Sequence, residues 1–330
     1  MTEQTVGTAP PKRRRRRLKI AGVVVAVAAV ALAFAFRQPS PVGHWNSAEG
    51  HARFTAAYDR AMADMPRAAE TIDVRTGFGF VRVHRYQGAS GRAGPLVLLP
   101  GRASASPVWA DNLPHLLKIG DVYTIDLLGE PGKSVQEAPI TSDADQAAWL
   151  DQVLAQLPEE SFHLVGLSIG GWTAVNLAVH RPRHVATLTL LDPVYTFSGI
   201  PAGTAIRAIP ASVPWLPKSW RDSFNSYTAG GAPVEDVPVA DMIESGMENY
   251  TLRLPQPSLI AEGALSGLTM PVLAILAGES VMHDPGVSRE VAGRVLRNGT
   301  VKVYPEASHA INGEHPEEVA ADIAVFLDAH

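Results

Sequence analysis

The chain has 330 residues and a net charge of −5; 46% of its residues are hydrophobic and 18% are charged. This composition is typical of globular proteins and excludes a wholly disordered chain. The absence of cysteine excludes disulfides, Cys₄ zinc sites and a cysteine nucleophile. The length allows one or two domains.

Charge is distributed unevenly along the chain. Residues 1–19 hold seven of the 28 Lys and Arg side chains and one of the 33 acidic ones, which leaves 21 basic and 32 acidic side chains for the rest. Proteins that bind nucleic acid cluster Lys and Arg against the phosphates. We therefore expect no nucleic-acid partner for the acidic body.

The segment that follows the basic cluster is apolar. Residues 20–36 contain no charged side chain, and as a helix they would span about 25 Å, enough to cross a thin hydrocarbon core. Basic flanks stay in the cytoplasm, which places the body outside. We predict a cytoplasmic tail (1–19) and a single-pass anchor in the cell membrane (20–36). The alternative is a signal peptide whose cleavage gives a secreted protein.

Residues 37–70 are predicted to hold a linker and an amphipathic helix. Two prolines and a glycine in residues 37–45 indicate the linker. Ser47 is a candidate helix cap, and apolar residues recur after it at helical spacing. We expect this helix to pack on the body.

Residues 71–330 alternate between strand-like and helix-like segments. Residues 78–86 alternate in polarity and predict an antiparallel strand. Continuous apolar runs, typical of strands buried on both faces of a parallel sheet, occur at 95–99, 122–125, 162–165, 185–191, 272–276 and 301–304. Helical stretches lie at 107–119, 143–157, 169–180, 285–296 and 316–330. The alternation predicts a doubly wound, mostly parallel α/β sheet, and residues 193–257 are too long for a loop and predict an inserted cap.

The segment Gly166-Leu167-Ser168-Ile169-Gly170-Gly171 has the Gly-x-Ser-x-Gly pattern. It directly follows one apolar run and opens a helical stretch, which is the strand–turn–helix context of a nucleophile elbow. Glycines permit the tight turn, and the helix N-terminus supplies N–H groups for an oxyanion. Ser168 is therefore the candidate nucleophile.

With this motif, the chain resembles the serine α/β-hydrolases from about residue 71 to its C-terminus. Three further segments carry the resemblance: 126–134 after one strand, Leu191-Asp192-Pro193 after another, and Ala307-Ser308-His309 near the end. The resemblance implies an α/β-hydrolase fold with a cap. It also implies oxyanion donors at the backbone of Ile169 and Arg102, although Pro100 stands where the family commonly has His.

The resemblance places the catalytic base after the last strand, at His309, with His315 as a weaker competitor. A serine hydroxyl needs such an imidazole to accept its proton. The acid remains open. The family usually places it after the strand 272–276, where Asp284 and Glu279 are available. Asp192 at the end of the preceding strand is the alternative that we rank first.

The predicted function is that of a serine hydrolase, a carboxylic-ester hydrolase acting through a Ser-His-Asp triad and an acyl-enzyme. It uses no cofactor and no metal, and its substrate is a small apolar ester. The cap aromatics, among them Trp215 and Trp220, are expected in part to wall a pocket above Ser168. A cofactor-free perhydrolase or C–C hydrolase with the same triad is an alternative, as is a catalytically silent binding protein of this fold. The sequence predicts no oligomeric state.

Overall fold

The structure is a computed structural model that describes residues 39–89, 94–213 and 215–330, and residues 41–330 form one compact unit. The predicted tail (1–19) and anchor (20–36) lie outside the described residues. Within the described ranges, no helix has both the length and the apolar character needed to cross a membrane.

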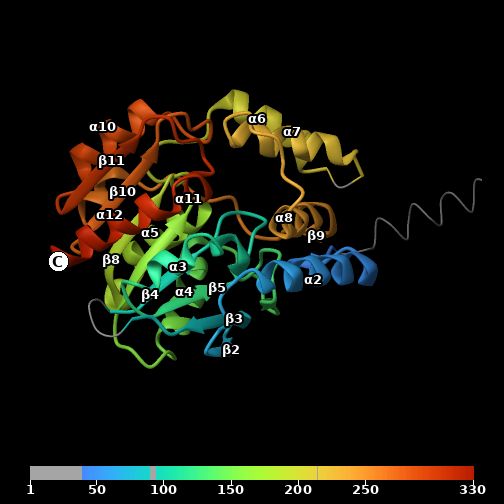
Figure 1. Ribbon diagram of the computed structural model, residues 1–330, viewed down its shortest axis with the longest axis horizontal. Coiled ribbons are helices and arrows are strands. Elements are labelled where there is room, and N and C mark those ends of the chain that lie inside the picture. Colours follow the sequence, from blue (N-terminus) through green and yellow to red (C-terminus); the bar gives the residue numbers. More distant parts are fainter. Residues whose placement is uncertain (1–38, 90–93, 214) are drawn as a thin grey trace, which may run out of the picture. The chain divides into compact units, whose positions relative to one another are not determined.

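A mixed nine-stranded sheet forms the centre of this unit (Figure 1). Its strands are β2 (Glu70–Thr76), β3 (Gly79–Tyr86), β4 (Leu96–Leu99), β5 (Val122–Ile125), β6 (Val135–Gln136), β7 (Phe162–Leu167), β8 (Val185–Leu191), β10 (Val272–Ala277) and β11 (Gly299–Tyr304). The order is β11-β10-β8-β7-β4-β5-β3-β2, and β6 also pairs with β3. The six strands from β11 to β5 are parallel, whereas β3 pairs antiparallel with β5, β2 and β6. The doubly wound, mostly parallel sheet is thus confirmed.

The core lies on both faces of the sheet because successive side chains of a strand point to opposite faces. In β4, Val97 and Leu99 belong to one apolar cluster, while Leu96 and Leu98 belong to the other. The first cluster includes residues of α4, α5 and α10, and the second includes residues of α3 and α12. Burial on both sides explains why these strands are continuous apolar runs in the sequence.

The helices of the sheet layers are α3 (Leu113–Leu116), α4 (Asp143–Leu154), α5 (Ile169–His180), α9 (Glu262–Ser266), α10 (Pro285–Val295), α11 (Ile311–Glu314) and α12 (Pro316–Asp328). One predicted helix, 107–119, is wrong. The chain there forms a 3₁₀ turn (Ser106–Trp109) and then the short α3. Pro114 has no N–H to donate, so a helix that began earlier would lose a hydrogen bond there; Pro114 instead lies in the first turn of α3.

Between β8 and β10 the chain leaves the sheet to form α6 (Ala202–Ala211), α7 (Lys218–Thr228), α8 (Pro238–Asn249) and β9 (Tyr250–Thr251). We call these elements the cap; they lie within residues 193–257. The helices α6 and α7 run side by side at the top of Figure 1.

Residues 44–63 pack against this cap. β1 (His44–Trp45) pairs antiparallel with β9, and α2 (Ala48–Ala63) packs along α8 (Figure 1). The contact between α2 and α8 is apolar: Phe54 and Tyr58 share a buried cluster with Met242. The expected cap residue is confirmed, because the Ser47 hydroxyl accepts a hydrogen bond from Gly50 N at 2.9 Å. Residues 37–45 are not all linker, since β1 lies among them.

Candidate active site

Ser168 lies in a sharp turn between β7 and α5, with φ +54° and ψ −117°. This φ is unusual for a residue with a side chain and costs of order 1–3 kcal/mol. The flanking glycines make the turn sterically possible. A Cβ on Gly170 would lie 2.1 Å from Leu99 O, and one on Gly166 would lie 2.4 Å from Gly170 O. The local sequence thus places the Ser168 hydroxyl at the carboxyl end of the sheet.

Three side chains that are distant in sequence meet at this point. His309 Nε2 lies 2.9 Å from Ser168 Oγ, and His309 Nδ1 lies 2.6 Å from Asp192 Oδ2. Ser168 follows β7, Asp192 follows the neighbouring β8, and His309 follows β11. Carboxyl ends of parallel strands share one edge of the sheet, which brings the three side chains together. Nδ1 carries the proton towards the carboxylate, so Nε2 is free to accept the proton of Ser168.

The other candidates for the acid and the base lie elsewhere. Asp284 caps α10, where its carboxylate accepts a hydrogen bond from Val287 N at 2.9 Å. Glu279 is exposed, and His315 Nδ1 lies 4.0 Å from Glu318 Oε1. The hydrogen bonds therefore favour Asp192 over Asp284 and Glu279, and His309 over His315.

Asp192 is fully buried, and its φ of +45° is again left-handed. Burial by itself raises the pKa of a carboxyl group. Here the hydrogen bonds and charges of His283 and His309 outweigh that burial and hold the pKa of Asp192 well below its usual range. The side chain is therefore an anion that can stabilise a positive charge on His309.

Sequence reasoning missed two of the partners of Asp192. Ser280 Oγ donates to Oδ2 at 2.6 Å, and His283 Nε2 lies 2.6 Å from Oδ1. Both residues belong to the turn after β10, where an acid was expected. The signal was present in the sequence, since that turn offers donors at Ser280 and His283 instead of a carboxylate at the usual offset.

The loop that carries His309 is fixed from two sides. Glu314 accepts hydrogen bonds from Ser308 N at 2.8 Å and from Ser308 Oγ at 2.5 Å. From the cap, the carbonyl of Thr228 at the end of α7 accepts from His309 N at 3.2 Å. The cap thus takes part in holding the imidazole in place.

The two predicted oxyanion donors flank Ser168. Ile169 is the first residue of α5, a position whose N–H has no acceptor within the helix. The loop with Arg102 lies against the serine, since a Cβ on Gly101 would be 3.7 Å from Ser168 Cβ. Glu130 holds this loop, because its carboxylate accepts from Ala103 N at 3.2 Å and pairs with the Arg102 guanidinium at 3.2 Å.

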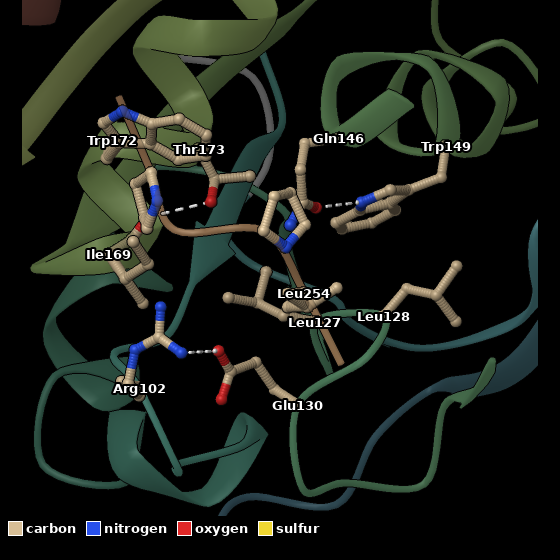
Figure 2. Close-up of a pocket in the computed structure, with 12 residues that line it drawn as sticks. Arg102, Leu127, Leu128, Glu130, Gln146, Trp149, Ile169, Trp172, Thr173 and Leu254 are labelled. Atoms are coloured by element: carbon tan, nitrogen blue, oxygen red, sulfur yellow. Dashed lines mark hydrogen bonds and ion pairs between the residues drawn. The ribbon is translucent and has the colours of Figure 1, made fainter. Parts of the chain in front are cut away.

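A small pocket adjoins these donors (Figure 2). It encloses about 10 Å³, which is about the space of one water molecule. Its lining residues are Arg102, Leu127, Leu128, Glu130, Gln146, Trp149, Ile169, Trp172, Thr173, Leu254, Pro255 and Pro257. The expectation that some of the cap aromatics wall a pocket is not met here, because none of them lines this pocket, and Trp215 and Trp220 are 82% and 50% exposed. The apolar wall comes instead from α4, α5 and the chain that returns from the cap.

In the described part of the chain, no group of three or more His, Asp or Glu side chains is arranged to hold a metal ion. The chemistry that the site offers is that of an activated hydroxyl, an imidazole and a buried carboxylate.

Comparison with known proteins identifies the family of the chain. Residues 96–322 match the alpha/beta hydrolase family. The chain belongs to that family. Carboxylesterase YbfK of Bacillus subtilis is 25% identical over 292 residues, which cover 85% of this chain and 95% of that protein. Its crystal structure superposes with a TM-score of 0.78 at 24% identity, covering 86% of this chain and 99% of that one.

A second relative has a different substrate. N-formylmaleamate deformylase of Pseudomonas putida is 30% identical over 264 residues, which cover 75% of this chain and 93% of that protein. The family and these relatives support a hydrolase.

Proposed function

We propose that the protein is a serine hydrolase of carboxylic esters, in which Ser168, His309 and Asp192 form the catalytic triad. The observation that carries the proposal is the unbroken chain of hydrogen bonds from Ser168 Oγ through both nitrogens of His309 to Asp192. An isolated serine on a tight turn would need neither the histidine nor the buried anion. The carboxylesterase relative supports an ester as the substrate.

The reaction follows from the positions of these groups. Ser168 Oγ attacks the ester carbonyl while His309 Nε2 takes its proton, and Asp192 stabilises the imidazolium. The backbone N–H groups of Ile169 and Arg102 bind the oxyanion. The tetrahedral intermediate expels the alcohol, which receives the proton from His309, and leaves an acyl group on Ser168. Water, deprotonated by the same imidazole, then releases the carboxylic acid.

The narrow pocket beside Ile169 and Arg102 indicates which acyl groups the substrate carries. It is lined mainly by apolar side chains and is small, so we expect short, apolar acyl groups to be hydrolysed faster than long ones.

Labelling with a fluorophosphonate, together with hydrolysis of p-nitrophenyl acetate, tests the proposal. We expect Ser168→Ala to abolish labelling and to lower kcat by about 10⁴-fold or more, because removal of a triad member leaves only the contribution of the oxyanion hole and of binding. Ser106→Ala is the matched control, since Ser106 is a buried serine that donates to Asp126 at 2.6 Å instead of to a histidine. Undiminished labelling of Ser168→Ala, or no labelling of the wild type, would contradict the proposal.

We further propose that residues 20–36 anchor the protein in the cell membrane with the hydrolase domain outside the cytoplasm. The support is in the sequence, where an uncharged apolar segment follows a basic cluster. An ester substrate that reaches the site from the extracytoplasmic side fits this location.

A further inference from the structure

The carboxylate of Asp192 is shared between two histidines. Oδ2 accepts from His309 Nδ1 at 2.6 Å and from Ser280 Oγ at 2.6 Å. Oδ1 accepts from His283 Nε2 at 2.6 Å and from Ala277 N at 2.9 Å. An ionised carboxylate has about four acceptor sites, so all of them are used. The rotation of Asp192 is fixed by donors on both oxygens.

His283 is itself buried and bonded at both ring nitrogens. Its side chain is 0% exposed, and Nδ1 lies 3.1 Å from Ser288 Oγ, which in turn lies 2.9 Å from Ser198 Oγ. Nε2 faces an anion at 2.6 Å and therefore carries a proton. Nδ1 either accepts from Ser288 in the neutral ring or donates to it in the imidazolium.

The titratable groups that face His283 are Asp192 from the end of β8 and Asp284 from its own turn, while α10 and the segment after β8 contribute the uncharged Ser288 and Ser198. Burial lowers the pKa of His283, but the hydrogen bond and charge of Asp192, with help from Asp284, outweigh it, so the pKa lies above the ordinary histidine value. The protonated form of His283 is therefore favoured relative to that of an exposed histidine.

We propose that His283 is a positioning residue of the triad, which orients Asp192 towards His309 and, when protonated, weakens His309 as a base. This inference rests on the proposed function. The reason for the second effect is electrostatic. Asp192 stabilises the imidazolium of His309 during the reaction, and a second cation on its other oxygen competes for that negative charge.

The acid stands after β8 instead of after β10, and this position explains why Ser280 and His283 surround it. With the carboxylate at the end of β8, the turn after β10 faces an anion and supplies Ser280 and His283 as donors. A carboxylate at position 280 or 283 of that turn would instead lie beside Asp192 and repel it.

Two substitutions at position 283 separate the two roles. His283→Gln places an amide donor near the position of Nε2 but cannot be protonated, and His283→Leu fills the space without a donor. At pH 8 we expect His283→Gln to keep kcat within about threefold of the wild type and His283→Leu to lose about 10- to 100-fold in kcat, with KM little changed, because Asp192 is then free to rotate.

The pH profile of kcat/KM, measured from pH 5 to 9, is the second readout. We expect the ratio of kcat/KM at pH 5.5 to that at pH 8 to be at least about threefold higher for His283→Gln than for the wild type, because the competing cation is gone. The control is His84→Gln. His84 is also buried and bonded at both nitrogens, to Tyr58 Oη at 3.0 Å and Thr71 Oγ1 at 2.9 Å, but to no member of the triad. We expect its pH profile to match the wild type.

A wild-type pH profile for His283→Gln would overturn the electrostatic role, and equal kcat for the Leu and Gln variants would overturn the positioning role. If the melting temperature shows that His283→Leu does not fold, the kcat and the pH profile of His283→Gln decide the test. Fluorophosphonate labelling of Ser168 separates this inference from the proposed function. If the wild type is labelled but the position-283 variants behave like it, only the inference about His283 fails.

Discussion

At the scale of single residues, backbone strain is concentrated at the site. Three of the four non-glycine residues with positive φ in the described part of the chain are Ala103, Ser168 and Asp192. They belong to the predicted oxyanion loop, the nucleophile and the acid. Each such conformation costs of order 1–3 kcal/mol and persists only where the surroundings enforce it. Hydrogen bonds to Glu130 and from Ala277 supply that enforcement at Ala103 and Asp192.

Substitution of single residues distinguishes Asp192 from Asp284 as the catalytic acid. We expect Asp192→Asn to lower kcat by roughly 10²- to 10⁴-fold, because the amide no longer stabilises the imidazolium and disturbs the tautomer of His309. Asp284→Asn should change kcat less than about threefold, since Asn also caps helices and Asp284 bonds Val287 N. Steady-state hydrolysis of p-nitrophenyl acetate measures both. The opposite order of losses would return the role of the acid to Asp284.

At the scale of elements, the contact between α2 and α8 determines how the cap is held. Gly50 of α2 is buried against Asn249 at the end of α8, and a Cβ on Gly50 would lie 2.5 Å from Asn249 Oδ1. Asn249 has little freedom to move away, because Arg53 donates to its Oδ1 at 2.9 Å and its Nδ2 donates to Ser245 O at 2.9 Å. The close approach of the two helices therefore requires glycine.

A pair of glycine substitutions tests this contact. We expect Gly50→Ala to lower the free energy of unfolding by about 1–2 kcal/mol, because overpacking exceeds the gain in helix propensity. The control is Gly293→Ala in α10, where an added Cβ meets nothing within 4 Å, and we expect it to raise the free energy by up to about 1 kcal/mol. Urea denaturation measures both. Stabilisation by both substitutions would mean that α2 and α8 separate without cost.

At the scale of the whole molecule, residues 41–330 are a compact unit that holds every residue of the proposed site. We therefore expect a chain that lacks residues 1–37 to keep kcat and KM within about twofold of the full-length protein. We also expect the truncated chain to stay in the supernatant after ultracentrifugation with membranes, whereas the full-length chain sediments with them, because residues 20–36 supply the apolar length for an anchor. Sedimentation of the truncated chain with membranes would refute a single anchor.

The sequence by itself determined the features that depend on burial and on short-range steric requirements. The alternation of apolar runs and helical stretches specified the parallel sheet, because burial on both faces removes polar residues from its strands. The glycines around Ser168 specified the elbow, because no side chain fits where Gly170 meets Leu99. The position of His309 followed from the resemblance to a known family, whose pattern places the base after the last strand. The helix predicted at 107–119 failed where a second proline, Pro114, prevented a continuous hydrogen-bond ladder.

Only the tertiary structure decided which groups meet. Asp192 is 117 residues from His309 and 91 residues from His283, and their contact depends on the order of β8, β10 and β11 in the sheet. The sequence ranked Asp192 above Asp284 only because the turn after β10 lacks a carboxylate at the usual offset, and both residues remained candidates. The structure distinguishes them because one carboxylate receives four donors in a dry interior and the other caps a helix. The pairing of β1 with β9 could not be predicted from the sequence either, because a two-residue strand is too short to show a periodic pattern.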